Sequence, residues 1–219
     1  ADGSGVVIKI SGVWRCKMEH NLGVIETNAP HMLYDTMIAP LVPMAMRGFI
    51  WYQGEGNSNE PDLYRARFPL LIRDWRRTWG GRMIPFLFVQ LPSIKSSSPE
   101  NWIRLREAQA LALSEPATGM CVTIDAGDLN GEHPTNKQIV GLRLALNALE
   151  KVYGRNIAGT SPYYKSHSIV NQSAHIIFDN TYGGLEIRGK ISEKVFELAG
   201  QDGIFHVAEA FLAGEIVVV

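Results

Sequence analysis

One histidine, His133, lies in an acidic segment, the sequence Asp-Ala-Gly-Asp-Leu-Asn-Gly-Glu-His-Pro of residues 125–134. An imidazole can take up a proton near neutral pH, and a neighbouring carboxylate can orient it. The segment therefore predicts a general base at His133, oriented by Asp125, Asp128 or Glu132. The same composition also fits a solvated histidine in a loop before a helix, because the helix dipole favours acids at that position.

A second segment with the residue types for chemistry is Gln-Gly-Glu-Gly-Asn, residues 53–57. Its glycines allow backbone amides to come close to a ligand, and the amides of Gln53 and Asn57 can donate hydrogen bonds to a developing oxyanion. This pattern is equally typical of an ordinary glycine-rich turn.

Other residue types predict no further site. The remaining histidines lie at no metal-ligand spacing, and neither Cys16 nor Cys121 belongs to a Cys-x-x-Cys motif. The formal net charge is −1, and no apolar run reaches the length of about 18 residues that a membrane span needs. We therefore expect no metal, no nucleic-acid partner and no membrane partner.

The elements that position the two segments alternate between strand and helix over residues 33–155. Apolar runs predict three strands, near residues 48–53, 84–91 and 119–125. Helical spacing predicts helices over 61–79 and 101–114, and a third helix that a capping box of Thr135 and Gln138 opens. This alternation is typical of a parallel sheet covered by helices, in which ligands bind beyond the carboxyl ends of the strands. Both candidate segments follow such strand ends.

The helical spacing also predicts which faces are buried. In the first helix, the expected inward residues are Leu63, Phe68, Leu71 and Trp75, and the expected solvated arginines are Arg65, Arg67, Arg73 and Arg76. In the third helix, the expected inward residues are Ile139, Leu142, Leu146, Leu149 and Tyr153. Tryptophans are expected to pack in the core, although Trp51 or Tyr52 at a strand end could stack on a sugar ring.

The two ends of the chain differ from this middle part. Residues 1–32 predict a β segment over 5–14 and a linker. After Gly154 the helical period ends, and we expect an antiparallel, β-sandwich-like region over residues 156–219. Its short strand-like pieces are 174–178, 185–188, 195–199, 205–212 and 215–219.

Several runs of the sequence, in order, resemble the sialate O-acetylesterase family. They are residues 33–41, 47–57, 64–69, 74–76, 85–91, 105–109, 122–128, 133–138, 196–200 and 202–203. The resemblance implies an SGNH-type hydrolase domain, that is, a flavodoxin-like three-layer αβα parallel sheet with a C-terminal β-sandwich-like region. It also implies an O-acetylated sugar as substrate, no cofactor, and an exported or lysosomal enzyme, although no residue pattern indicates a compartment.

The resemblance assigns expected roles by position. In this family a serine attacks the acetyl carbonyl, a histidine takes the proton, and water then releases the acetate. His133 matches the catalytic histidine, with Asp128 as the preferred orienting acid and Asp125, Glu132 or a backbone carbonyl as alternatives. The block that helps to build the oxyanion hole and the substrate rim is matched by Gln53, Gly54, Glu55 and Asn57.

The sequence departs from the family pattern in three respects. The family's nucleophile block, of the type Gly-Gln-Ser-Asn, is expected upstream of this chain, and no serine of the chain stands in such a block. Gly56 replaces the usual serine, and Asn130 replaces an expected aspartate. We therefore expect an N-terminal part of the same enzyme, as a separate chain or a missing segment, to supply the serine, so that this chain alone is inactive. The alternatives are an esterase for acetylxylan or another acetylated sugar, and a non-catalytic sugar-binding homologue.

Overall fold

The computed structural model of the chain describes residues 31–95, 98–128, 131, 133–187 and 196–219. They belong to two units that divide between Met44 and Ala45. The described part of the first unit contains a π-helix, η1 (Tyr34–Ile38), and a 3-10 helix, η2 (Ala39–Leu41). The β segment expected over residues 5–14 lies outside the described residues.

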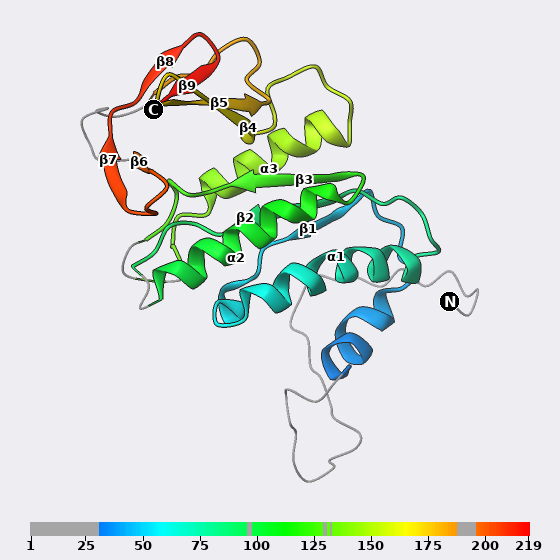
Figure 1. The fold of residues 1–219 in the computed structure, drawn as a ribbon. Coiled ribbons are helices and arrows are strands. Elements are labelled where there is room, and N and C mark those ends of the chain that lie inside the picture. Colours follow the sequence, from blue (N-terminus) through cyan, green and yellow to red (C-terminus); the bar gives the residue numbers. More distant parts are fainter. Residues whose placement is uncertain (1–30, 96–97, 129–130, 132, 188–195) are drawn as a thin grey trace, which may run out of the picture. The chain divides into compact units, whose positions relative to one another are not determined.

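The second unit is built on a parallel three-stranded sheet of order β1-β2-β3 (Figure 1). The strands are β1 (Phe49–Trp51), β2 (Phe86–Gln90) and β3 (Thr118–Val122). Phe86 is in register with Phe49 on one side and with Thr118 on the other. The prediction of three parallel strands is confirmed, with each strand somewhat shorter than its apolar run.

Helices cover both faces of this sheet. They are α1 (Pro61–Thr78), α2 (Pro99–Leu111) with its 3-10 extension η4 (Ala112–Ser114), and α3 (Gln138–Lys151). Phe88 contacts Phe68 of α1, whereas its neighbour Val89 packs against Val140 and Leu144 of α3. Because successive side chains of a strand point to opposite faces, α1 and α3 lie on opposite sides, and the three-layer prediction is confirmed. None of the described helices has the length and apolarity to cross a membrane.

The predicted inward face of α1 is partly wrong. Leu63 is 37% exposed, and the buried residues of α1 are Pro61, Tyr64, Phe68, Ile72 and Arg76. Arg76 was expected in solvent but is only 6% exposed, because its guanidinium donates hydrogen bonds to the carbonyls of Ile84, Pro116 and Ala117. A buried cation is tolerated where its donors find such partners.

The predictions for α3 need two corrections. The N-cap is Lys137 rather than Thr135, and the amide of Gln138 is bound by the side chain of Asn136 instead of a capping box. The buried residues are Val140, Leu144 and Asn147, whereas Leu142, Leu149 and Tyr153 are exposed. Packing against the sheet determines which face of α3 is buried. Val140 and Leu144 pack against Leu87 and Cys121. Asn147 lies so close to Gly119 that a Cβ at position 119 would be 2.1 Å from the Asn147 side-chain oxygen.

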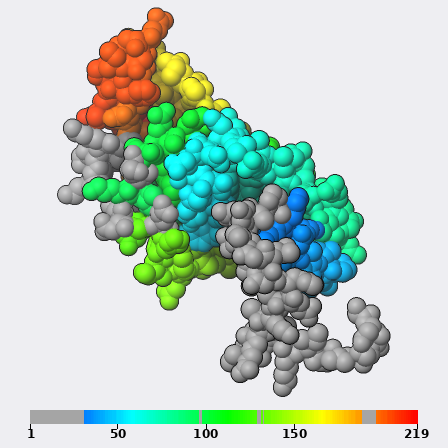
Figure 2. All heavy atoms as spheres, turned by 90° about the horizontal axis from the view of Figure 1, so that it is seen from below, coloured from blue at the N-terminus to red at the C-terminus, as the bar shows by residue number. Residues whose placement is uncertain are grey.

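The C-terminal region consists of two antiparallel sheets. One has the order β4-β5-β9-β8, with strands β4 (Tyr163–Val170), β5 (Ser173–Asp179), β8 (Phe211–Ala213) and β9 (Ile216–Val218). The other pairs β6 (Phe196–Ala199) with β7 (Phe205–Ala208). Side chains of both sheets share one core around Ala174 and Val217, so the sandwich-like prediction is confirmed. Figure 2 shows the atoms of this region, in yellow to orange-red, at one end of the face in view.

Three strand boundaries in this region differ from the prediction. The strand β4 is not among the predicted strands, because its sequence is polar and shows no strand pattern. It is a strand because it pairs with β5. Residues 185–187 form no strand. The expected strand over 205–212 is divided into β7 and β8, which belong to different sheets.

Candidate active site

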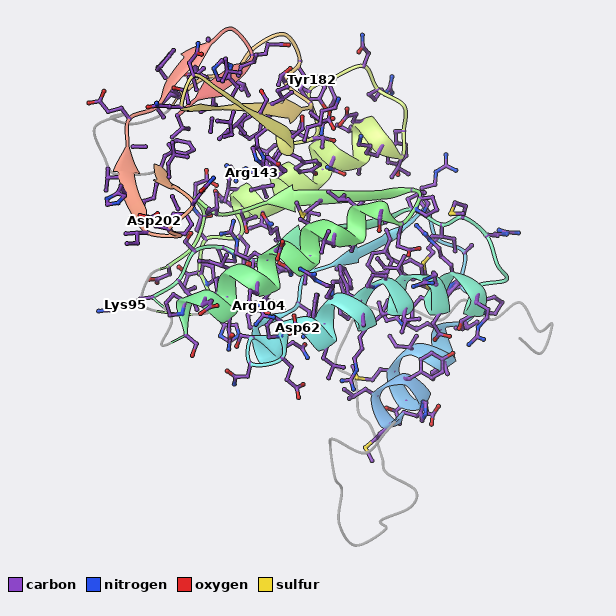
Figure 3. All side chains as sticks on the ribbon, in the orientation of Figure 1. Asp62, Lys95, Arg104, Arg143, Tyr182 and Asp202 are labelled. Carbon is purple, nitrogen blue, oxygen red and sulfur yellow. The ribbon has the colours of Figure 1, made fainter. Side chains whose placement is uncertain are left out.

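The two candidate segments leave the same edge of the sheet. Parallel strands have their carboxyl ends together, so the segments after β1, β2 and β3 all begin at this edge. Figure 3 labels Lys95, which follows β2, and Asp62 at the start of α1, both toward this end of the unit. The sequence prediction that the chemistry gathers at one strand-end edge is consistent with this topology.

Gln109 of α2 joins the ends of β1 and β2. Its side chain is fully buried; Nε2 donates to the carbonyl oxygen of Gln53 at 3.2 Å, and Oε1 accepts from the backbone N–H of Leu91 at 2.9 Å. The Gln53 carbonyl also accepts a hydrogen bond from the hydroxyl of Tyr64, at 3.3 Å. Reasoning from the sequence missed this role, although a lone glutamine on the apolar face of a helix was an available signal.

Gly54 allows the chain to turn sharply after β1. Its φ of +151° is unfavourable for other residues, and a Cβ there would lie 3.1 Å from both Gln109 Nε2 and Leu91 Cδ1. Gly56 is different, because a Cβ there would meet nothing within 4 Å. The structure thus requires glycine at position 54 and leaves open space for a side chain at position 56.

The turn after β1 brings the predicted oxyanion residues together. Gln53 Nε2 donates to Asn57 Oδ1 at 2.8 Å, and Glu55–Asn57 form the 3-10 helix η3. The backbone N–H of Asn57 is used within the turn, where it donates to the Gly54 carbonyl at 2.8 Å. The side-chain amide Nδ2 of Asn57 therefore remains the donor of this residue that could reach a ligand. The oxyanion role of the turn stays a prediction.

His133 lies between β3 and α3 in an exposed position. The segment around it is anchored on both sides, by a β-bridge between Asp128 and Gly131 and by the buried Pro134. Glu132 and Asn130, which the sequence also singled out, lie outside the described residues. A solvent-accessible imidazole at the carboxyl edge of the sheet suits a general base that acts on a group brought from another segment.

The two aspartates expected near His133 are placed differently. Both carboxylate oxygens of Asp125 are bound by Arg143 of α3, and this contact raises the pKa of the Arg143 guanidinium. The backbone carbonyl of Asp128 accepts a hydrogen bond from Gly131 at 3.2 Å, which holds the tight bend before His133. The assignment of the orienting acid stays a prediction.

The aromatic residues at the end of β1 have separate environments. Trp51 packs among aromatic side chains of the core, with its ring centroid 5.6 Å from that of Trp75 and 6.3 Å from that of Phe68. The ammonium of Lys137 lies 4.5 Å from the Tyr52 ring, which links the end of β1 to the start of α3. Burial, with the nearby Glu55 charge, raises the pKa of Tyr52. Tyr52 is therefore a neutral phenol at the rim of the site.

The comparisons with known proteins agree with this architecture. The family of carbohydrate esterases described as sialic acid-specific acetylesterases matches residues 20–149. Sialate O-acetylesterase of Mus musculus is 34% identical, over 77% of this chain and 35% of that protein, and the Homo sapiens enzyme is 32% identical, over 77% and 36%. A crystal structure of a carbohydrate acetylesterase from Xanthomonas citri superposes with a TM-score of 0.79 at 40% identity and covers 85% of this chain.

The same comparisons show how much of the relatives the chain represents. It spans about a third of the length of the two mammalian enzymes and 44% of the Xanthomonas chain. Within that part, the family match includes both the turn after β1 and the segment that carries His133. The parallel sheet, its strand-end segments and these matches together show that the chain belongs to the sialic acid-specific acetylesterase family of carbohydrate esterases.

Proposed function

We propose that this chain is the histidine-bearing part of a carbohydrate O-acetylesterase that removes acetyl groups from sialic acid. The observation that carries the proposal is that the family match includes both Gln53–Asn57 and His133, the two segments that leave the carboxyl edge of one sheet. The sialate O-acetylesterase name of the mammalian relatives supports sialic acid as the substrate.

In the proposed reaction His133 takes the proton of a serine hydroxyl while the serine oxygen attacks the acetyl carbonyl. The resulting oxyanion accepts hydrogen bonds from the turn after β1, with Asn57 Nδ2 as one donor. When the intermediate collapses, the protonated His133 gives its proton to the departing sugar oxygen, and the acetyl group stays on the serine. His133 then activates a water molecule, which releases acetate and restores the serine.

The nucleophilic serine is supplied by a part of the enzyme outside these 219 residues. No serine of the chain stands in the family's nucleophile context, and the chain spans only 35% of the mouse relative. Asp128 is the preferred residue to orient His133, because the bond between Arg143 and Asp125 leaves the latter less suited to a second partner.

A second candidate is an esterase for acetylxylan or another acetylated sugar. The Xanthomonas protein, which is 40% identical, is named a carbohydrate acetylesterase without reference to sialic acid. The fold alone does not identify the sugar, because one fold serves many substrates. A third candidate, a sugar-binding protein without catalysis, rests on the absence of the serine block from the sequence.

One assay separates these functions. The longest natural polypeptide that contains this chain is incubated with O-acetylated sialic acid and, separately, with acetylxylan, and acetate release is followed. Release from sialic acid supports the main proposal, and release from acetylxylan alone supports the second. Binding of either sugar without release of acetate supports the third. Acetate release by the 219-residue chain itself, abolished by replacing one of its own serines, contradicts an external nucleophile.

A further inference from the structure

We propose that Lys137, the residue before α3, binds the carboxylate of sialic acid and so distinguishes this sugar from neutral acetylated sugars. The inference deepens the proposed function and rests on it for the placing of the substrate at the carboxyl edge of the sheet. Its structural basis is a contact between Lys137 and Tyr52, which connects the two candidate segments.

Lys137 follows closely on the histidine of the proposed reaction. It comes four residues after His133 and is the N-cap of α3, with an exposed side chain. Its ammonium lies 4.5 Å from the centre of the Tyr52 ring and donates a hydrogen bond to the Tyr52 hydroxyl at 3.4 Å. Tyr52 directly precedes Gln53, the first residue of the turn after β1. One contact thus places a cation next to both segments that the proposed reaction uses.

Tyr52 is a well-anchored support for this cation. Its side chain packs against the apolar cluster between the sheet and α3. The next carbonyl along the chain, that of Gln53, accepts hydrogen bonds from Gln109 and Tyr64. The face of an aromatic ring attracts a cation. A cation held in place before the ligand arrives loses less conformational entropy on binding.

The charge of Lys137 is available to a ligand. None of the ion pairs among the described residues involves it. The negative charge of Glu55 acts on the neighbouring Tyr52, but Glu55 is not paired with Lys137. An ammonium has three N–H donors. Because one of them is given to Tyr52, the others can reach a carboxylate.

Other cations near this edge have different environments. Arg143 is bound by Asp125. Arg104 of α2 is bound by Asp62. Lys95, in the loop after β2, is as exposed as Lys137, but no ion pair or ring contact of the described part of the chain holds it in place. Lys95 is therefore the natural reference for a cation that is present at the edge but is not positioned.

The proposed substrate supplies the matching charge. Sialic acid carries a carboxylate at neutral pH, whereas an acetylated xylose unit of xylan is uncharged. A chain of four residues spans at most about 14 Å, so His133 and Lys137 can contact the same monosaccharide. A hydrogen bond between an ammonium and a carboxylate is stronger than one between neutral groups. Lys137 therefore favours sialic acid over a neutral sugar of similar size.

Binding of sialic acid and of its methyl ester tests this role. The longest natural polypeptide that contains the chain is titrated with each compound in a calorimeter, and the ratio of the two dissociation constants is determined. We expect the uncharged methyl ester to bind about fivefold or more weakly. Lys137→Gln should bring the ratio close to one, and Lys137→Arg should keep most of it. Lys95→Gln should leave the ratio unchanged.

Tyr52→Leu tests the support of the cation. Leucine keeps an apolar side chain in the cluster but removes the ring and the hydroxyl, so we expect the ratio to fall by about two- to fivefold. A merely structural loss would weaken the binding of both compounds alike and would leave the ratio as it is.

Several results would overturn the proposal. They are a failure to bind sialic acid, equal binding of the two compounds by the unaltered polypeptide, an unchanged ratio in Lys137→Gln, and an equal loss in Lys95→Gln. The measurement uses neither an acetyl ester nor turnover. It can therefore fail in a protein that releases acetate and succeed in one that releases none, which separates this inference from the proposed function.

Discussion

Arg143 binds both oxygens of the Asp125 carboxylate, with Nη1–Oδ1 and Nη2–Oδ2 distances of 2.5 and 2.6 Å. Nη1 also donates to the carbonyl of Val122, the last residue of β3, at 2.8 Å. A bidentate bond of this kind restricts orientation as well as distance. The two bonds between Arg143 and Asp125 therefore connect the start of the segment that carries His133 to α3, the helix that follows this segment.

Replacing Arg143 with lysine tests this positioning role. Lysine cannot form the two parallel bonds, so we expect faster amide exchange over residues 123–128 and an acetate-release rate lower by about 10- to 100-fold in the polypeptide that carries the serine. The pair is half-exposed, so we expect stability to fall by about 1 kcal/mol or less. Arg67→Lys, at an exposed site of α1, is the control; equal effects of both substitutions would contradict the role.

Replacing His133 with alanine tests the general base. In the polypeptide that carries the serine we expect acetate release to fall by about 1000-fold or more, because the base and the nucleophile act as a unit. Asp128→Ala should cost less, since a misoriented imidazole keeps some basicity. His133 is exposed, so the melting temperature should not change. His206→Ala on the exposed strand β7 serves as control, and unchanged activity of His133→Ala would exclude the assignment.

Adding a side chain at the two glycines of the turn after β1 should affect stability differently. Gly54→Ala places a Cβ in tight contact at a φ of +151°, so we expect a loss of about 1–3 kcal/mol in the free energy of unfolding. Gly56→Ser meets open space and should change stability by about 0.5 kcal/mol or less. Urea unfolding of both variants measures the difference, and similar values would show that the turn is not constrained as described.

The buried amide of Gln109 should contribute strongly to stability. Gln109→Leu has a similar volume but leaves the backbone N–H of Leu91 without its acceptor, so we expect a loss of about 2–3 kcal/mol in the free energy of unfolding. Gln138→Leu replaces an exposed glutamine at the start of α3 and provides the reference. A loss no larger than that of the reference would show that Gln109 does not join the strand ends.

The thiol of Cys121 should be unreactive in the folded chain. Burial raises its pKa to about 11 from the ordinary 9.0, so the thiolate is scarce at pH 8. In a Cys16→Ser variant we expect Ellman's reagent to react only after urea is added. The raised pKa also means that the unfolded chain loses this proton first, so stability should fall between pH 9 and pH 11. A Cys121→Ala variant should lack this contribution.

The sequence by itself determined the strands and helices of the α/β part and the order of its candidate segments. Apolar runs of strand length around Phe49 and Phe86, and the Ser98–Pro99 helix start, depend on local preferences that each residue carries with it. The position of His133 after a strand and before a helix follows from the same local signals. The family resemblance also rests on sequence, because it needs only residue types in order.

Tertiary structure alone decided which of these side chains meet. Arg76 is buried because three carbonyls from distant loops converge on it, and Asn147 faces the sheet because Gly119 leaves space beneath it. Gln109 reaches Gln53 across 56 positions of the chain. Hydropathy and spacing describe one residue and its neighbours along the chain, whereas a buried polar group is stabilised by partners that only the packing of separate elements brings within hydrogen-bond distance.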